Sequence, residues 1–235
     1  MARRRKQGRK PWWLYLVASV VLAAVAATIW HWWDMQSWRP NESVYPDQGV
    51  EVGEANGRVA FETVRALGGK FVYLEASNGA EAKDSQFARN LAAARRTGLQ
   101  AGAVHHFDPC VSADRQSANF VTVVPREGDL LPPAIALVRT ADDCNPKVSD
   151  ASVESELMTF INQVEMHAGK RAILKLSEGF EARYGIAGTI ERDLWLVRDR
   201  FSPDYAGRPW LLWSANRALR SDISAEPVEW IVVQP

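Results

Sequence analysis

From about residue 49 onward, short apolar runs alternate with longer segments in which apolar residues recur every three or four positions. A short apolar run between turn residues predicts a buried strand, whereas a period of 3.6 residues predicts a helix. Strands that alternate with helices over most of a chain indicate an α/β fold with a parallel sheet. The predicted strands cover residues 50–52, 71–75, 101–107, 134–138, 172–176, 194–197, 210–213 and 229–233.

Three of the intervening segments have clear helical patterns, at residues 85–97, 113–124 and 152–167. The last is the best defined, because Ser152 can cap it and Gly169 can end it. Eight strands fit a closed barrel better than an open sheet, although their spacing alone leaves both arrangements open. The last three strands have no helix between them. We therefore predict an irregular, TIM-like α/β barrel.

The N-terminal part of the chain differs from this pattern. Residues 11–33 contain no Asp, Glu, Lys or Arg, and the apolar run 12–33 is long enough to cross a bilayer core of about 30 Å. Tryptophans gather at both ends of the run, as in the aromatic belts of membrane-spanning helices. They are Trp12 and Trp13 at one end and Trp30, Trp32 and Trp33 at the other. The pattern predicts a single transmembrane helix over residues 12–33.

The charges on either side of this run predict its orientation. Residues 1–10 hold six basic side chains and no acid, and the positive-inside rule keeps such a segment in the cytoplasm. We therefore expect a basic cytoplasmic tail at residues 1–11, a stalk at 34–46 and an exported domain at 47–235. The protein would be a single-pass protein of the bacterial inner membrane, with its C-terminal domain periplasmic or otherwise extracytoplasmic.

A cleaved signal peptide is the alternative, because Ala24, Val25 and Ala26 offer an A-x-A cleavage site. Such cleavage would cut the apolar segment in the middle and leave its Trp-rich half as an exposed apolar N-terminus. An uncleaved anchor is therefore favoured.

Composition narrows the function further. The 225 residues after the basic segment carry 22 Lys and Arg against 28 Asp and Glu, a formal charge of −6, which matches nucleic acid poorly. H-E-x-x-H, G-x-S-x-G and Gly-rich phosphate motifs do not occur, so we expect no metal and no cofactor.

On the oxidising side of the membrane, Cys110 and Cys144 can form a disulfide; two unpaired buried thiols are the alternative.

Side chains that could carry chemistry fall in or beside the predicted strands. In an α/β barrel, catalytic groups sit at the carboxyl ends of the strands. Each such residue taken alone is more often structural than catalytic. His105 and His106 would point to opposite faces of one strand, so they cannot both ligate one metal ion. The candidates are Glu51, Glu75, His105, His106, Lys175, Arg198 and Glu229.

A series of short motifs runs in order through residues 45–235. The stretch G-V-E-V-G-E-A-N-G at 49–57 is similar to G-I-D-V-S-H-H-Q-G, and F-V-Y-L-E-A-S-N-G at 71–79 is similar to F-V-Y-I-K-A-T-E-G. Q-S-A-N-F at 116–120 and L-P-P-A at 131–134 continue the series. These motifs resemble those of glycoside hydrolase family 25, the lysozymes (N-acetylmuramidases) that cleave peptidoglycan. The resemblance implies an irregular α/β barrel, peptidoglycan as ligand, and a Cys110–Cys144 pair like that of a bacterial subgroup.

The departures from the family pattern fall on the chemistry. Glycoside hydrolysis needs a carboxylic acid that protonates the leaving oxygen, and a second carboxylate. The family places this pair as D-x-E directly after its L-P-P motif, where this chain has Ala136 and Val138. Two further family aspartates correspond to Glu51 and Glu229, which keep the carboxylate but reach one methylene further. The resemblance thus implies a divergent member without its catalytic pair.

Three functions fit this pattern. The favoured one is a membrane-anchored lysozyme-like pseudoenzyme that binds peptidoglycan glycan strands or a cell-envelope protein partner without cleavage. The first alternative is an active muramidase in which Glu51, Glu229 or Glu75 has become a substitute acid, with its pKa raised by burial. The second is a protein-interaction module of a cell-envelope complex that no longer binds glycan. The predicted substrate-binding side chains are His105, Lys175, Arg198 and Trp213.

Overall fold

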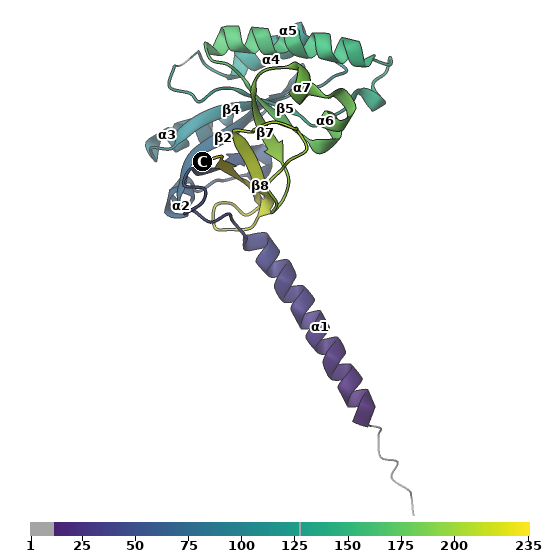
Figure 1. Cartoon of the computed structure of the whole chain (residues 1–235). Helices are drawn as coiled ribbons and strands as arrows, with labels where there is room; N and C mark the ends of the chain where they lie inside the picture. Colours follow the sequence, from purple (N-terminus) through teal and green to yellow (C-terminus); the bar gives the residue numbers. More distant parts are fainter. Residues whose placement is uncertain (1–11, 127) are drawn as a thin grey trace, which may run out of the picture. The chain divides into compact units, whose positions relative to one another are not determined.

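The computed structural model describes residues 12–126 and 128–235, and it divides into two compact units with their boundary between Trp38 and Arg39. The predicted basic tail at residues 1–11 lies outside the described residues. In the first unit, α1 (Trp12–Ser37) is one continuous helix (Figure 1). Its stretch Trp12–Asp34 is long and apolar enough to cross a membrane, a test that a signal sequence also passes. The helix continues past residue 33 because neither proline nor glycine interrupts the chain before Pro40.

The second unit is a closed barrel of eight strands with helices packed around it (Figure 1). The sheet closes because β1 pairs with both β2 and β9. Six strand pairings in the barrel are parallel, whereas β9 is antiparallel to both of its neighbours. The predicted irregular α/β barrel is therefore confirmed. The barrel strands are β1 (Gln48–Val52), β2 (Gly69–Asn78), β4 (Gln100–His106), β5 (Ala134–Leu137), β6 (Ile173–Leu176), β7 (Asp193–Val197), β8 (Leu212–Leu219) and β9 (Val228–Val233).

Each barrel strand overlaps its predicted range, and the largest difference is at β8. This strand runs from Leu212 to Leu219, whereas the apolar pattern predicted residues 210–213. The pattern failed because the strand continues through Ser214 and Asn216, which are polar but buried. The register also shifts between these two residues, so the strand lacks the regular apolar alternation on which the prediction depended. The two-residue β3 (Ala82–Lys83) pairs with β2 alone and adds a short edge outside the barrel.

The three predicted helices are confirmed as α3 (Phe87–Arg96), α4 (Ala113–Val123) and α5 (Asp150–Ala168). The N-cap of α5 is Ser149 and not Ser152, because the Ser149 hydroxyl accepts the backbone N–H of Ser152. Gly169 ends α5 as predicted, with a left-handed φ of 67°. Short elements without a full apolar stripe were not predicted. These are α2 (Phe61–Ala66), α6 (Glu178–Tyr184), α7 (Ile186–Thr189), η1 (Glu54–Asn56) and η2 (Ala141–Asp143).

Apolar side chains fill the barrel interior toward the amino ends of the parallel strands. Tyr73 and Trp195 lie with their ring centroids 5.0 Å apart, and Gly102 leaves room for the Tyr73 ring. A Cβ at position 102 would lie 2.4 Å from that ring, closer than packed atoms approach. This apolar packing leaves room for polar side chains only near the carboxyl ends of the parallel strands, which we call the barrel mouth. The interior cluster comprises Phe71, Tyr73, Val104, Ala134, Ala136, Ile173, Trp195, Leu212 and Ile231.

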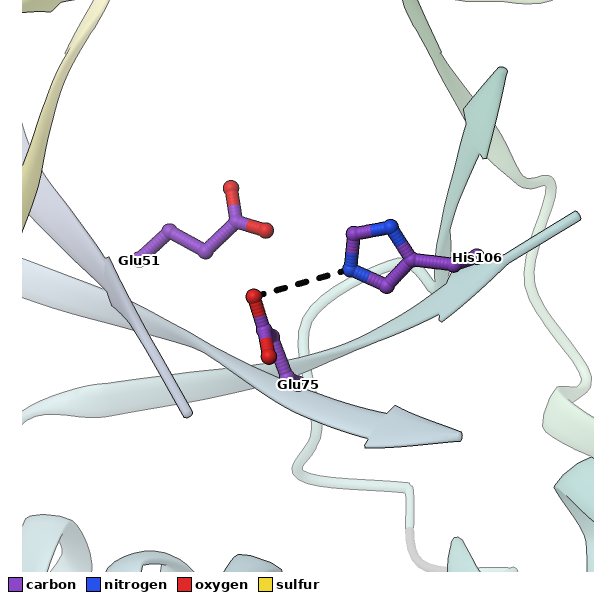
Figure 2. Close-up of side chains that lie close together, drawn as sticks. All are labelled: Glu51, Glu75 and His106. Carbon is purple, nitrogen blue, oxygen red and sulfur yellow. Dashed lines mark ion pairs between the residues drawn. The ribbon is translucent and has the colours of Figure 1, made fainter. Parts of the chain in front are cut away.

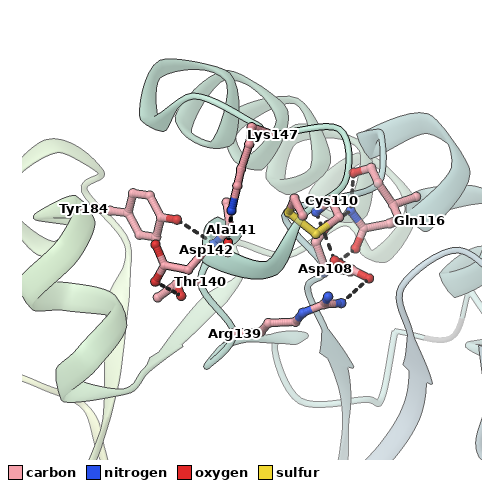
Figure 3. The surroundings of a disulfide bond; sticks show 11 residues. Asp108, Cys110, Gln116, Arg139, Thr140, Ala141, Asp142, Lys147 and Tyr184 are labelled. Atoms are coloured by element: carbon pink, nitrogen blue, oxygen red, sulfur yellow. Dashed lines mark hydrogen bonds and ion pairs between the residues drawn. A yellow bond between two sulfur atoms is a disulfide. The ribbon is translucent and has the colours of Figure 1, made fainter.

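A disulfide joins the loops that follow β4 and β5, as the sequence predicted (Figure 3). Cys110 and Cys144 have their Cα atoms 5.2 Å apart. Beside the bridge, the Arg139 guanidinium forms a 2.8 Å ion pair with Asp108. Asp108 also accepts the backbone N–H of Cys110. The disulfide thus holds together two loops at the carboxyl ends of neighbouring parallel strands.

Candidate functional site

Carboxylates from three strands lie close together at the barrel mouth. Glu51 lies near the carboxyl end of β1 and Glu75 in the second half of β2. Glu229 is near the start of β9, but this strand is antiparallel, so its start lies at the same end as the carboxyl ends of the parallel strands. The register places Glu51 directly opposite Glu229. The topology therefore brings together three of the acids predicted from the sequence.

Lys175 from β6 binds two of these carboxylates at once. Its ammonium contacts Glu51 and lies 2.7 Å from Glu229. The Lys175 and Glu51 side chains are 6% and 5% exposed, and that of Glu229 is 17% exposed. The Trp195 ring covers the ammonium at 4.6 Å from its centroid, and the Ser214 hydroxyl donates to Glu229. We call Glu51, Lys175 and Glu229 the buried triad.

Burial and charge act on the triad in opposite directions. Burial raises the pKa of Glu51 to about 8, and the Glu229 charge adds to this effect although the Lys175 ammonium opposes it. Burial alone would lower the pKa of Lys175, but Glu229 and Glu51 outweigh it and hold that pKa above its usual value. Lys175 is therefore a fixed cation at neutral pH, and Glu51 is the member of the triad that readily takes up a proton.

Glu75 and His106 form a second pair next to the triad (Figure 2). The Nε2 atom of His106 lies 3.6 Å from a Glu75 carboxylate oxygen. Interaction with His106 lowers the pKa of Glu75 below its ordinary value. Burial would lower the pKa of His106, but Glu75 and Glu51 outweigh burial and raise it. Glu75 is thus an anion at neutral pH, whereas its neighbour Glu51 favours the protonated form.

Glu51, Glu75 and His106 also have the spacing of metal ligands, since one ligand atom from each lies within 4.8 Å of the others. The Lys175 ammonium is bound to the Glu51 carboxylate and already supplies a positive charge there. A metal cation would have to compete with this fixed charge. The donor set is therefore less suited to a metal than its spacing alone suggests.

The strand β5 contributes no carboxylate to the site. Ala136 is buried in the interior cluster, and Val138 follows the end of the strand with 53% of its surface exposed. In the resemblance described above, these two positions carry the catalytic pair. The wall that faces the triad from β5 is thus apolar.

Three other predicted site residues lie apart from the triad. His105 is buried on the face of β4 opposite to His106, where Ser77 binds its Nδ1 at 2.8 Å and Phe160 packs on its ring. Burial lowers the pKa of His105 to about 4. Arg198 forms a 2.7 Å ion pair with Asp204, and its carbonyl accepts the indole N–H of the buried Trp213.

Two residues that the structure adds to the site were not among the candidates. Ser214 and Trp195 contact the triad directly. His106 was a candidate, but His105 and not His106 was predicted to bind substrate. Glu75 and His106 also line a polar groove of about 320 Å³. Its other lining residues are Glu54, Ser77, Asn78, Ala82, Lys83 and Asp84. The alternation of β4 predicts that only one of the two adjacent histidines faces the interior, but not which one.

Comparison with known proteins agrees with this geometry. The family model for glycosyl hydrolases family 25 matches residues 50–215. The protein YegX of Escherichia coli is 26% identical over 196 residues, which cover 80% of this chain and 70% of YegX.

Two solved structures have the same fold. A family 25 glycosyl hydrolase from Bacillus anthracis superposes with a TM-score of 0.75 and 23% identity, over 85% of this chain and 93% of that chain. The bacterial lysozyme of Streptomyces coelicolor gives a TM-score of 0.70 and 18% identity, over 80% of this chain and 92% of that chain.

Proposed function

The chain belongs to glycosyl hydrolases family 25, and on this premise we propose that it is a membrane-anchored domain that binds peptidoglycan without hydrolysing it. In this proposal, α1 holds the protein in the bacterial inner membrane as a single-pass anchor. The barrel lies on the periplasmic or extracytoplasmic side. The disulfide supports this location, because disulfides persist in oxidising compartments.

The main support for the proposal is that one ammonium group, that of Lys175, binds the carboxylates of both Glu51 and Glu229. A glycosidase acid must reach the glycosidic oxygen, and its partner carboxylate must face the sugar from about 5–9 Å away. Here both carboxylates point at Lys175 and are largely shielded from solvent. Release of either one would leave buried charges unpaired, which is strongly unfavourable. The triad therefore serves structure better than it serves proton transfer.

The apolar positions on β5 support the same conclusion. Ala136 and Val138 can neither donate nor accept a proton, and loss of a general acid alone typically costs about 10²–10⁴ in rate. Catalytic geometry tolerates displacements of about 1 Å poorly, so the longer Glu51 and Glu229 side chains do not replace the missing pair.

Binding, in contrast, needs only a polar groove, and the groove at the barrel mouth provides one. It offers the hydrogen-bonding side chains of Glu54, Asn78 and Lys83, all of which are exposed. Sugars present many hydroxyl groups that both donate and accept hydrogen bonds. Carboxylate, amide and ammonium groups together can satisfy both kinds of partner.

Two assays on the same preparation test the proposal. The full chain, in non-ionic detergent, is mixed with insoluble sacculi, and both its retention and the release of reducing ends are measured. We expect retention without release of reducing ends, while an active lysozyme in parallel releases them. Robust release would contradict the pseudoenzyme proposal. Neither retention nor release would favour an interaction module of a cell-envelope complex instead.

A second function, hydrolysis by a substitute acid, is favoured by the opposite pKa shifts of Glu51 and Glu75. A pair of neighbouring carboxyl groups whose pKa values are driven apart is the arrangement of an acid and a nucleophile. Their oxygens lie within 4.8 Å, near the separation of about 5–5.5 Å in retaining glycosidases. If hydrolysis occurs, Glu51→Gln and Glu75→Gln should each abolish it, whereas Glu81→Gln, at an exposed ion pair, should not.

The anchor is tested by the mass of the mature protein. The membrane-extracted chain should retain all residues of α1. A mature N-terminus near residue 28 would instead identify a cleaved signal peptide and contradict the anchor.

A further inference from the structure

A separate pocket of about 460 Å³ lies on the side of the barrel between α2 and α3. Val59, Phe61 and Ala93 give it an apolar floor. Three exposed arginines, Arg58, Arg89 and Arg96, surround this floor, and Glu62 is the one acid among the lining residues. The charge of the pocket is therefore positive, although the exported unit as a whole is acidic.

Two of the three arginines are available to a ligand. Arg89 donates to the carbonyl oxygen of Gly57 at 2.9 Å, which fixes its position on the rim. Arg58 and Arg96 form no ion pair with any carboxylate of the described residues. A guanidinium presents several donors in a planar fork that matches a carboxylate, so the rim is suited to anionic groups.

Asn90 gives an independent sign of a ligand. It lines the pocket and is only 2% exposed, yet its carboxamide makes no hydrogen bond to any residue in the described part of the chain. Its polar atoms are not among the fully enclosed ones that lack a partner, so they open to the pocket, where a ligand or water can bind them. The Asn90 carboxamide offers one N–H₂ donor group and one carbonyl acceptor. A peptide group offers the complementary acceptor and donor, whereas a phosphate or a lipid headgroup phosphate offers acceptors alone.

The arginines are also spaced for an extended ligand. Arg89 and Arg96 are seven residues apart on one face of α3, which separates them by about 10 Å along the helix axis. An extended peptide spans this distance in about three residues.

We propose that this pocket binds the carboxylate-bearing stem peptides of peptidoglycan, with Asn90 paired to a peptide group between the arginines. The inference rests on the proposed function and adds the peptide to the glycan as a recognised part of the ligand. The chain connects the two sites closely. Glu54 and Asp84 line the groove at the barrel mouth, and Arg58 and Arg89 follow them by four and five residues.

Calorimetric titration of the full chain in non-ionic detergent with a soluble stem tetrapeptide tests the pocket directly. The double variant Arg58→Gln/Arg96→Gln should bind the peptide at least tenfold more weakly. Asn90→Leu should do the same without a lower melting temperature, because an apolar side chain of similar size replaces a buried amide that has no partner. Arg115→Gln, which loses the same charge at an exposed ion pair elsewhere, should bind like the wild type.

Equal peptide affinity in all four proteins would overturn the pocket assignment. The assignment would also be overturned if inorganic phosphate or vesicles of anionic phospholipid displaced the peptide and their binding depended on the same arginines.

Retention on sacculi separates the two proposals. Both proposals are supported if the wild type is retained less on sacculi stripped of their stem peptides than on intact sacculi, and the arginine double variant shows no such difference. Equal retention on intact and stripped sacculi overturns the peptide pocket and leaves glycan binding standing. Peptide binding in the calorimeter without retention on either kind of sacculus overturns the proposed function alone.

Discussion

Glu51 on β1 and Glu229 on β9 occupy directly opposed positions of an antiparallel strand pair, and the Lys175 ammonium contacts both carboxylates. Like charges opposite one another destabilise a sheet. Lys175 removes this repulsion from a third strand, β6, which lies across the barrel interior from that pair. Lys175 thus supplies the counter-charge for Glu229 and a hydrogen-bond donor for Glu51, whose raised pKa further relieves the repulsion.

Removal of the ammonium should therefore destabilise the fold. In Lys175→Met a chain of similar length leaves the Glu229 carboxylate without its cation and Glu51 without its donor, and the loss should be about 3–5 kcal/mol in the free energy of unfolding. Lys70→Met is the matched control, because Lys70 pairs with Asp47 at an exposed site and should cost less than about 1 kcal/mol. Urea denaturation of both variants measures the difference. Equal losses would show that the triad has no special role.

The pH dependence of stability should reveal the protonation of Glu51. Burial raises its pKa in the folded state from 4.5 to about 8, so between these pH values the folded state binds the proton and the unfolded state does not. The stability contributed by protonated Glu51 is complete below pH 4.5 and is lost as the pH rises toward 8. Relative to Glu51→Gln, the wild type should lose stability over this range by at most about 1.4 kcal/mol per pH unit. Denaturation of both proteins at several pH values tests this, and a relative gain with rising pH would mean that pairing with Lys175 outweighs burial.

Restoration of the family pair should not restore hydrolysis. In Ala136→Asp/Val138→Glu the aspartate enters an apolar cluster, and the glutamate stands beyond the end of β5 at an exposed position. Lys175 still binds Glu51 and Glu229 in this variant. We expect a folded protein, checked by circular dichroism, that releases no reducing ends from peptidoglycan. Clear release would show that the two substitutions alone account for any lost activity.

Loss of the disulfide should lower stability without loss of the barrel. Cys110 and Cys144 enclose a loop of 34 residues, for which the chain-entropy model gives about 3–4 kcal/mol. The double variant Cys110→Ala/Cys144→Ala should therefore unfold at lower denaturant concentration than the wild type. An unchanged midpoint would mean that the loops are held by other contacts, such as the ion pair of Arg139 with Asp108.

Residues close in sequence were predicted well because their structure depends on local patterns. The apolar stripe of α5 predicted a helix at residues 152–167, and the helix ends at Gly169 as predicted. Where local pattern and tertiary environment differ, the prediction failed. Strand β8 runs through Ser214 and Asn216, which are polar but buried. Its apolar signal therefore ends after Trp213, although the strand does not.

The sequence by itself determined the α/β class and the long apolar N-terminal helix, and its family resemblance added the closed barrel, the disulfide partners and the missing carboxylates at Ala136 and Val138. The first two follow from residue type and local periodicity, and the others from the order of short motifs along the chain; neither needs knowledge of distant contacts. Only the tertiary structure decided that Lys175 lies between Glu51 and Glu229, and that His106 rather than His105 faces Glu75. Glu51 and Lys175 are 124 residues apart. Their contact depends on barrel closure and strand register, which arise from all eight strands together and leave no signal in any one of them.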